Sequence, residues 1–323
     1  MPDNINLARL GLRNGVSDGS YAQENANFLE IFSGEVMTAF DTLAIFKELH
    51  RIRTITQGKG ASFPALGKMS ARYHKPGSAI TGSNNPPIGE RVINIDDLLI
   101  SDVSIYDLED AKLHYDVRGE YSRELGKALA KRFDQKIALL GYLAARGTGI
   151  TSAYSGGTTL THAQAATDKI ALNELVWKAA ETMDTKDVPE EDRHIIVKPT
   201  QYYMLVTNKD NLNRDWGGVG SLATGTLPMI ANMTVHKSNN LPNGKNITTK
   251  VEGENNSYLG DFTKSVALVM NRQAVGTVKM WDLAVEMSGH DYHVMYQADL
   301  IVAKYAMGHG VLRPDCAVEI AIA

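Results

Sequence analysis

The chain has 323 residues and a mass of 35.3 kDa, which suits two domains or one elaborated domain. Hydrophobic residues make up 43% of it and charged residues 22%, so disorder over the whole chain is excluded. The net charge is −4, so the chain lacks the overall basic balance that proteins wrapping duplex DNA usually show.

Cysteine usage and hydropathy bear on the compartment. Cys316 is the one cysteine, so the chain cannot form an internal disulfide, and it suits a reducing cytoplasm. Residues 1–19 contain no apolar stretch typical of a secretory signal. No window approaches the roughly 18 apolar residues needed to span a bilayer. We therefore expect neither export nor a membrane partner.

The first ninety residues divide into three segments. Residues 1–27 are polar and rich in Gly and Asn, which indicates an extended arm. Between residues 28 and 52, apolar residues recur at steps of three and four, which predicts an amphipathic helix or helical turns. Residues 55–90 contain six glycines and four prolines but few apolar runs. They predict a long extended hairpin that cannot bury a core of its own and must pack elsewhere, another chain included.

The strongest local signal is a helix over residues 116–146, after a strand predicted over 91–105 by alternating apolar residues. Apolar residues in the helix step almost uniformly by four, Asp116 can cap its start, and Gly147 can end it. At 1.5 Å per residue it would be roughly 45 Å long. A coiled coil is the alternative, but steps of four drift from a 3.5-residue repeat, so packing on a sheet is favoured.

The remaining sequence mixes helices and strands. A Gly/Ser/Thr linker at 147–159 leads to a second amphipathic helix at 162–183. A short strand at 194–197 precedes a turn and a helix that runs to residue 205. A turn at 241–244 follows, and further strands are predicted at 265–270, 276–286, 298–305 and 317–322. The order predicts a mixed α+β fold.

Three motifs could carry chemistry, and each has a simpler interpretation. The glycines at 217, 218, 220 and 225 suggest a phosphate loop, but the Lys-Ser/Thr step of a Walker motif is missing, which favours a surface loop. His290 and His293 could bind a metal, but no third ligand is nearby in the sequence. His309 lies between two glycines, which favours a tight turn between strands over an exposed catalytic imidazole. We therefore expect no metal, no cofactor and no catalytic residues.

The charges are unevenly distributed along the chain. Residues 47–75 contain seven basic residues and one acidic residue, a net charge of +6. Residues 90–124 contain ten acidic and four basic residues, a net charge of −6. Three interpretations stay open on charge alone: DNA binding by the basic segment, packing of the basic segment of one subunit on the acidic segment of another, or two solvated surfaces.

Several stretches resemble the major capsid proteins of T7-like short-tailed phages, that is, podoviruses of the autographivirus group. The matching stretches are FSGEVMTAF (32–40), FPALG (63–67), IYDLEDA (105–111), HYDVR (114–118), AVGTVK (274–279), AKYAMGHG (303–310) and LRP (312–314). They cover the front half and the last fifty residues in the expected order, whereas residues 150–270 match only loosely.

The resemblance implies an HK97-type capsid fold with an N-terminal arm, an extended E-loop, a peripheral domain with a long spine helix, and an axial domain. On this sequence those parts fall at 1–54 for the arm, 55–91 for the E-loop, 92–162 with 276–323 for the peripheral domain, and 163–275 for the axial domain. The spine helix is the segment 116–146.

The resemblance also implies a function. Such proteins are structural and not enzymes: they self-assemble as hexamers and pentamers into an icosahedral shell around packaged double-stranded DNA. The implied partners are other copies of the chain, a scaffolding protein during assembly, a portal at one vertex, and DNA on the inner face. The implied location is the virion, after synthesis in the cytoplasm of the bacterial host.

In this fold the E-loop lies across an adjacent subunit, which gives the charge pattern a meaning. We expect the basic segment of one subunit to contact the acidic segment of its neighbour. The candidate contact residues are Arg51, Arg53, Lys59, Lys68, Arg72 and Lys75 against Asp96, Asp97, Asp107, Glu109, Asp110 and Glu120.

Two other classes of function remain as alternatives. An encapsulin-type compartment shares the fold but stores enzymes, and it would be recognised by a cargo protein with a docking tag. A metal-dependent hydrolase would use His290, His293 and His309, and a metal assay on the purified protein would detect it.

Overall fold

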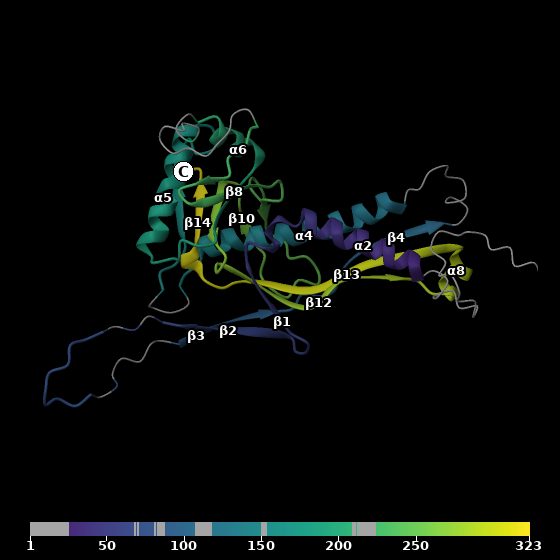
Figure 1. Ribbon diagram of the computed structural model, residues 1–323, viewed down its shortest axis with the longest axis horizontal. Helices are drawn as coiled ribbons and strands as arrows, with labels where there is room; N and C mark the ends of the chain where they lie inside the picture. The colour runs from purple at the N-terminus through teal and green to yellow at the C-terminus, as the bar shows by residue number, and fades with distance from the viewer. Residues whose placement is uncertain are drawn as a thin grey trace, which may run out of the picture. The chain divides into compact units, whose positions relative to one another are not determined.

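The computed structural model describes residues 26–67, 69, 71–80, 82, 88–106, 118–149, 154–208, 211 and 224–323. The chain divides into two compact units. The first unit consists of the described residues within Met1–Ala44, Leu98–Phe133 and Trp281–Ala306. The second unit consists of the described residues within Ile45–Asp97, Asp134–Met280 and Met307–Ala323. Figure 1 traces both units.

The first unit packs helices against a strand pair. It contains α2 (Ala26–Leu43), the first half of α4 (Arg118–Arg146), β4 (Leu99–Tyr106), α8 (His290–Tyr296), and parts of β12 (Val275–Met287) and β13 (Ala298–Val311). β13 pairs antiparallel with β4, from Ala298 opposite Tyr106 to Tyr305 opposite Leu99. α2 lies along α4 (Figure 1), where Gly126 leaves room because a Cβ there would lie 2.6 Å from the carbonyl oxygen of Val36.

Three aromatic rings fill the interior of this unit. The rings of Phe40 and Phe133 lie 5.7 Å apart, edge to face, and each also contacts Tyr305, at 6.1 and 6.4 Å. Edge-to-face contacts at such distances are the favoured geometry for aromatic pairs. α2, α4 and β13 are therefore joined by one aromatic cluster.

A six-stranded sheet organises the second unit, in the order β5-β14-β11-β6-β8-β7. β11 (Ser265–Asn271) lies inside the sheet between β14 (Ala317–Ala321) and β6 (Arg193–Val197), and it is antiparallel to both. β5 (Thr158–Thr161) is parallel to β14. β8 (Met233–Lys237) is parallel to β6 and antiparallel to β7 (Met229–Ile230). Every residue of β11 is buried, as expected for a strand covered on both faces.

Helices cover this sheet. α5 (Lys169–Thr185) lies beside β14 (Figure 1), and α6 (Pro199–Val206) contacts both α5 and β6. The second half of α4 lies against β11: a Cβ at Gly141 would come within 2.5 Å of the side chain of Leu268. The prediction that the long helix packs on a sheet is therefore confirmed.

The hairpin belongs to the second unit. β2 (Gly60–Leu66) pairs antiparallel with β3 (Ile88–Asn94), and β1 (Arg51–Thr54) pairs parallel with β12. A small apolar cluster lies at the base of the hairpin: Ala61, Phe63, Ile93, Val278 and Leu312. Among the described residues, the unit also contains the short elements η1 (Ile45–Lys47), β9 (Asn246–Ile247), β10 (Gly260–Asp261) and η3 (Pro314–Cys316).

Most predicted elements are confirmed. The α+β class, the extended hairpin, α6 and the end of the long helix at Arg146 all match. The proposed cap at Asp116 lies outside the described residues, as do the glycines at 217, 218 and 220. None of the helices in the described part of the chain is long and apolar enough to cross a membrane.

Two boundaries differ from the prediction. The helix predicted from residue 162 begins at Lys169, because the side chain of Asp168 accepts the backbone N–H of Ile170 at 3.0 Å and caps the helix there. The strand predicted over 91–105 is two strands. Between them the backbone N–H groups of Ile95 and Asp96 donate to the carbonyl oxygens of Lys59 and Met307.

The prediction of a turn at Gly308 to Gly310 is wrong, because these residues lie inside β13. These glycines do not form a turn; they allow another backbone segment to approach β13 closely. A Cβ at Gly308 would collide with the carbonyl oxygen of Asn94, and one at Gly310 would lie 2.7 Å from Ile93. Only glycine lets β13 pass this close to the backbone of β3.

Replacing Gly308 by Ala should destabilise the subunit by about 3 kcal/mol or more, because the collision is with backbone that cannot rotate away. Gly34→Ala is the matched control. Gly34 lies within α2 and a Cβ there meets nothing within 4 Å, so this change should stabilise by about 0.5–1 kcal/mol. Urea unfolding of both variants measures the difference. Equal stabilities would contradict the close-approach explanation.

Candidate functional site

The basic candidates on β1 are held by an aromatic ring. The guanidinium groups of Arg51 and Arg53 lie 5.9 and 5.7 Å from the ring centroid of Phe63. Arg53 also donates from Nη1 to the carbonyl oxygen of Ser62 at 2.7 Å. Both side chains are exposed, so this positive charge is presented to the surroundings in a fixed place.

The other basic candidates lie along the hairpin. Lys59, Arg72 and Lys75 are exposed. Ser78 donates from its backbone N–H and its hydroxyl to the carbonyl oxygen of Lys75, at 3.2 and 2.7 Å, which forms a local turn. Lys68 lies outside the described residues. The hairpin thus carries positive charge both at its base and beyond β2.

The acidic candidate Asp96 is engaged within its own chain. Its Oδ1 accepts the backbone N–H of Asn255 at 2.7 Å and the side-chain amide of Asn256 at 3.0 Å. Its Oδ2 accepts the hydroxyl of Tyr258 at 2.5 Å. The carboxylate therefore anchors the 255–258 segment, and its acceptor sites are largely occupied.

The remaining acidic candidates are placed differently. Asp97 is exposed and accepts one bond from the amide of Asn255 at 3.2 Å. Glu120, in the first turn of α4, pairs with Arg123 at 3.1 Å, with both side chains 70% exposed. Such an exposed pair contributes little to stability. Asp107, Glu109 and Asp110 lie outside the described residues.

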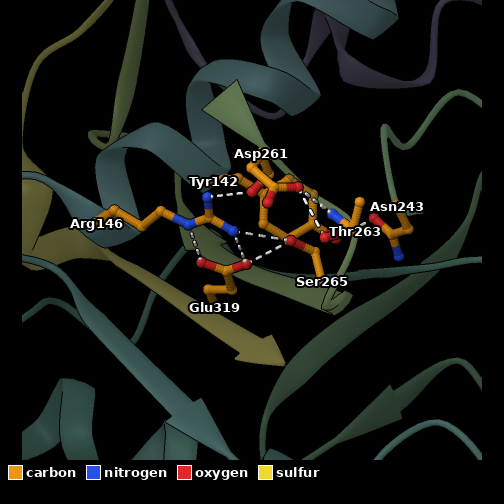
Figure 2. A network of polar contacts seen from close by, with 7 residues as sticks. All are labelled: Tyr142, Arg146, Asn243, Asp261, Thr263, Ser265 and Glu319. Carbon is orange, nitrogen blue, oxygen red and sulfur yellow. Dashed lines mark hydrogen bonds and ion pairs between the residues drawn. The ribbon is translucent and has the colours of Figure 1, made fainter. Parts of the chain in front are cut away.

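A buried ion pair at the end of α4 is a feature that the sequence did not reveal. Arg146 forms a bidentate ion pair with Glu319 (Figure 2). Its Nε donates a hydrogen bond to Oε2 and its Nη2 donates one to Oε1, both at 2.6 Å. Glu319 lies on β14 and is fully buried. Hydrogen bonding to Glu319 raises the pKa of Arg146 above its ordinary value. The last residue of the long helix is thereby joined to the C-terminal strand.

Further polar groups complete this network. Arg146 Nη1 donates to the carbonyl oxygen of Asp261 at 2.5 Å, and the hydroxyl of Ser265 donates to Glu319 Oε1 at 2.5 Å. One turn earlier on α4, Tyr142 donates its hydroxyl to Asn243 Oδ1 at 2.7 Å (Figure 2). Asn243 in turn donates to the carbonyl oxygen of Val266 at 2.6 Å. The helix end is thus fixed to three separate segments.

A second buried acid lies midway along α4. Asp134 accepts the backbone N–H groups of Ile45 and Phe46, both at 3.2 Å, and the amide of Asn240 at 3.1 Å. It thereby caps η1 from another helix. Burial raises the pKa of Asp134 to about 6.

A series of buried hydrogen bonds includes His309, the histidine that was predicted to lie in a turn. His50 Nδ1 lies 2.6 Å from the carbonyl oxygen of Phe46, and Thr277 Oγ1 lies 2.8 Å from both His50 Nε2 and His309 Nδ1. A carbonyl only accepts, so His50 Nδ1 carries a proton and donates it. Thr277 then donates to His50 Nε2 and accepts from His309 Nδ1. Burial lowers the pKa of His50 to about 4 and that of His309 to about 3.

His290 and His293, whose spacing was weighed as a metal motif, lie in α8, where His293 Nδ1 is 3.0 Å from Asp299 Oδ1. Across the described ranges, no group of three or more His, Cys, Asp or Glu side chains is arranged to hold a metal ion.

Comparison with known proteins decides the family. A family profile described as "Gp10A-like: Major capsid protein" matches residues 62–321. The major capsid protein of Escherichia phage T7 is 34% identical, over 96% of this chain and 95% of its own length. The chain belongs to the Gp10A-like major capsid proteins. The major capsid protein of Enterobacteria phage T3 is also 34% identical to this capsid protein, over 92% of each chain.

Solved structures give the same fold. The capsid structure of the cyanophage P-SCSP1u matches this capsid protein with a TM-score of 0.80 and 44% identity, covering 87% of this chain and 88% of that one. The mature capsid of bacteriophage PhiM1 matches with a TM-score of 0.71 at 15% identity over 87% of each chain, which shows the fold alone. The fold is therefore HK97-type, as the resemblance to phage capsid proteins implied.

The comparisons also address the alternatives. The relatives are structural capsid proteins and not enzymes, and this capsid protein is likewise a structural component of a phage shell. A virus-like particle from Pyrococcus furiosus shares the fold at 13% identity with a TM-score of 0.54. A storage compartment is not favoured, because the relatives of substantial identity are phage capsid proteins.

Glu319→Ala should destabilise the subunit by about 3 kcal/mol, because it leaves the Arg146 guanidinium partly buried without its carboxylate. Urea unfolding measures the loss. Glu286→Ala is the matched control: its carboxylate is 63% exposed in the pair with Lys304, so the effect should stay within about 1 kcal/mol. The double change Arg146→Met with Glu319→Leu should recover most of the loss. A neutral Glu319→Ala would contradict the assigned role.

The buried histidines should make stability depend on pH. Their folded pKa values lie below the ordinary value of 6.5, so the unfolded chain binds more protons, and stability is lost as pH falls from about 6.5 toward 4. Asp134 acts oppositely in this range, because its folded pKa is raised. In His309→Asn, the slope of unfolding free energy against pH between about 4.5 and 6 should decrease by about 1.4 kcal/mol per pH unit. An unchanged slope would show that His309 is not buried in its neutral form.

Proposed function

We propose that this protein assembles as hexamers and pentamers into an icosahedral shell that encloses phage double-stranded DNA. The observation that supports it most is the family match over residues 62–321, together with the 0.80 TM-score to a cyanophage capsid subunit. Closed shells are built by symmetric repetition of interfaces between copies of one chain, which suits a structural capsid protein.

The hairpin supports self-assembly on physical grounds. Every described residue from 71 to 80 is exposed, and Tyr73 and Ile80 leave large apolar surfaces in solvent. A segment of this kind buries little against its own chain. Docking on a neighbouring copy would cover these apolar side chains.

The proposed contact pairs the basic hairpin of one subunit with acidic residues of the next. Arg51, Arg53, Lys59, Arg72 and Lys75 are all exposed. Asp97 and Glu120 are the exposed acidic candidates within the described residues, since Asp96 is engaged internally. Lys68, Asp107, Glu109 and Asp110 remain part of the proposal. Each exposed pair is worth only about 0–1 kcal/mol, which favours reversible, error-correcting assembly.

The proposal includes the partners and the domain division expected from the sequence. The partners are a scaffolding protein during assembly, a portal at one vertex, and DNA on the inner face, with synthesis in the host cytoplasm. The division into an arm (1–54), an E-loop (55–91), a peripheral domain (92–162 and 276–323) and an axial domain (163–275) stays a prediction. β14, which this division assigns to the peripheral domain, pairs with β11 and β5 in the six-stranded sheet.

The function is tested by electron microscopy of the chain co-expressed with its phage's scaffolding protein. Closed shells of uniform diameter are expected. Small rings or monomers, with folded scaffold present, would overturn the proposal.

Reversing Arg72 and Lys75 to Glu should greatly reduce the yield of shells without unfolding the subunit, because it turns proposed attractions into repulsions while both residues are exposed. Each contact should weaken by about 1 kcal/mol or more. Sedimentation measures shell yield, and circular dichroism checks folding. The control reverses Lys169 and Lys178, which are exposed on α5, and changes the net charge equally. Normal shells from the hairpin variant would remove the charge-pairing proposal.

A further inference from the structure

A hollow of about 180 Å³ lies at the base of the hairpin, entirely within the second unit. Three arginines line it: Arg51 from β1, Arg91 from β3, and Arg313, which follows β13. Phe63 and Leu312 contribute apolar lining, and both belong to the buried cluster beneath the hairpin. The hollow therefore combines an apolar floor with three positive charges.

The three guanidinium groups are unequally satisfied. Arg313 has a carboxylate partner, since Nη2 donates to Asp315 at 2.6 Å, and its Nη1 donates to Gln273 Oε1 at 2.5 Å. Arg51 lies over the Phe63 ring, which is a weak interaction compared with a carboxylate. Arg91 Nε is buried and has no hydrogen-bond partner among the described residues. A buried donor without an acceptor is unfavourable, so the isolated chain leaves this site incomplete.

The shape and polarity of the hollow favour a carboxylate side chain. Its volume is below the roughly 300–1,000 Å³ typical of pockets for drug-sized ligands. Guanidinium groups match the planar fork of a carboxylate, and the apolar floor matches methylene groups behind it. A duplex phosphate backbone instead requires a run of basic groups on an open surface, and the chain as a whole is acidic.

We propose that this hollow receives a carboxylate side chain from a second copy of this chain, with Arg91 and Arg51 as its ligands. The inference rests on the proposed self-assembly, which brings copies to high local concentration. The base of the hairpin would thus contain a specific binding site for a carboxylate of the neighbouring copy, in addition to the diffuse charge pairing along the hairpin. The incoming carboxylate supplies the acceptor that Arg91 Nε lacks.

Arg91→Met tests the assignment because it should lower the stability of the shell without lowering that of the free subunit. In the free subunit the change removes an unsatisfied buried donor, so the urea midpoint of unfolding should stay the same or rise. In assembled shells the change removes the guanidinium group that binds the neighbour's carboxylate, so the urea midpoint of shell dissociation should fall. Arg132→Met is the control. Arg132 is an exposed arginine of α4, and the change alters net charge equally but should shift neither midpoint.

A density map of the assembled shell gives the direct readout. A carboxylate of a neighbouring copy within hydrogen-bond distance of Arg91 Nε is expected. Shells that form normally but hold water, a free ion or nucleic acid in the hollow would overturn this inference and leave the shell function intact. Equal midpoint shifts in subunit and shell, or none, would also overturn it.

If no shells form, the proposed function fails, and the soluble chain still tests the site. Glutarate and phosphate are then titrated while thermal unfolding is followed. Stabilisation by glutarate that is lost in Arg91→Met and kept in Arg132→Met would support the carboxylate site. Equal stabilisation by phosphate, or none by glutarate, would overturn it.

Discussion

The bidentate pair between Arg146 and Glu319 is the interaction on which the second unit depends. It joins the last residue of α4 to the final strand, in a place where Glu319 is fully buried. A buried carboxylate is tolerated only when its charge and lone pairs are met, and here Arg146 and Ser265 meet them. Because β14 lies between β5 and β11, fixing β14 to the helix also fixes the edge of the sheet beside it.

The same requirement explains the other polar groups along α4. Asp134 is buried in the middle of the helix and offers its oxygens to the backbone of η1 and to Asn240. Lys136, two residues later, pairs with Glu254. A helix with only apolar inner residues could slide or rotate on the sheet. Buried groups that each need one specific partner restrict it to one position.

The sequence predicted the parts of this fold that depend on local patterns. Leu125, Leu129, Phe133 and Ile137 recur at steps of four and are all buried, and α4 ends just before Gly147 as its glycine signal indicated. The start of α5 was also encoded locally, by the capping side chain of Asp168, although the prediction placed the start at residue 162. Family resemblance identified the shell function, which no local pattern could supply.

Features that depend on distant residues could not be predicted in this way. Gly308 looked like a turn residue because the reason for its glycine is the backbone of Asn94, far away in the sequence. Asp96 looked like a surface charge because its partners are at 255–258. Charge counting treats every carboxylate as solvated. It cannot separate those that hold the subunit together from those that face outward.

The position of β14 has a consequence for the timing of synthesis. Residues 317–321 lie between β5 and β11 in the sheet, yet they are synthesised after every other strand of that sheet. Until they arrive, β11 lacks a neighbour on one side and Arg146 lacks its carboxylate. Contacts between such distant residues form late because closing a long loop is entropically unfavourable. A nascent chain therefore cannot complete this sheet until β14 has been synthesised, because both the pairing of β11 and the ion pair of Arg146 wait for that strand.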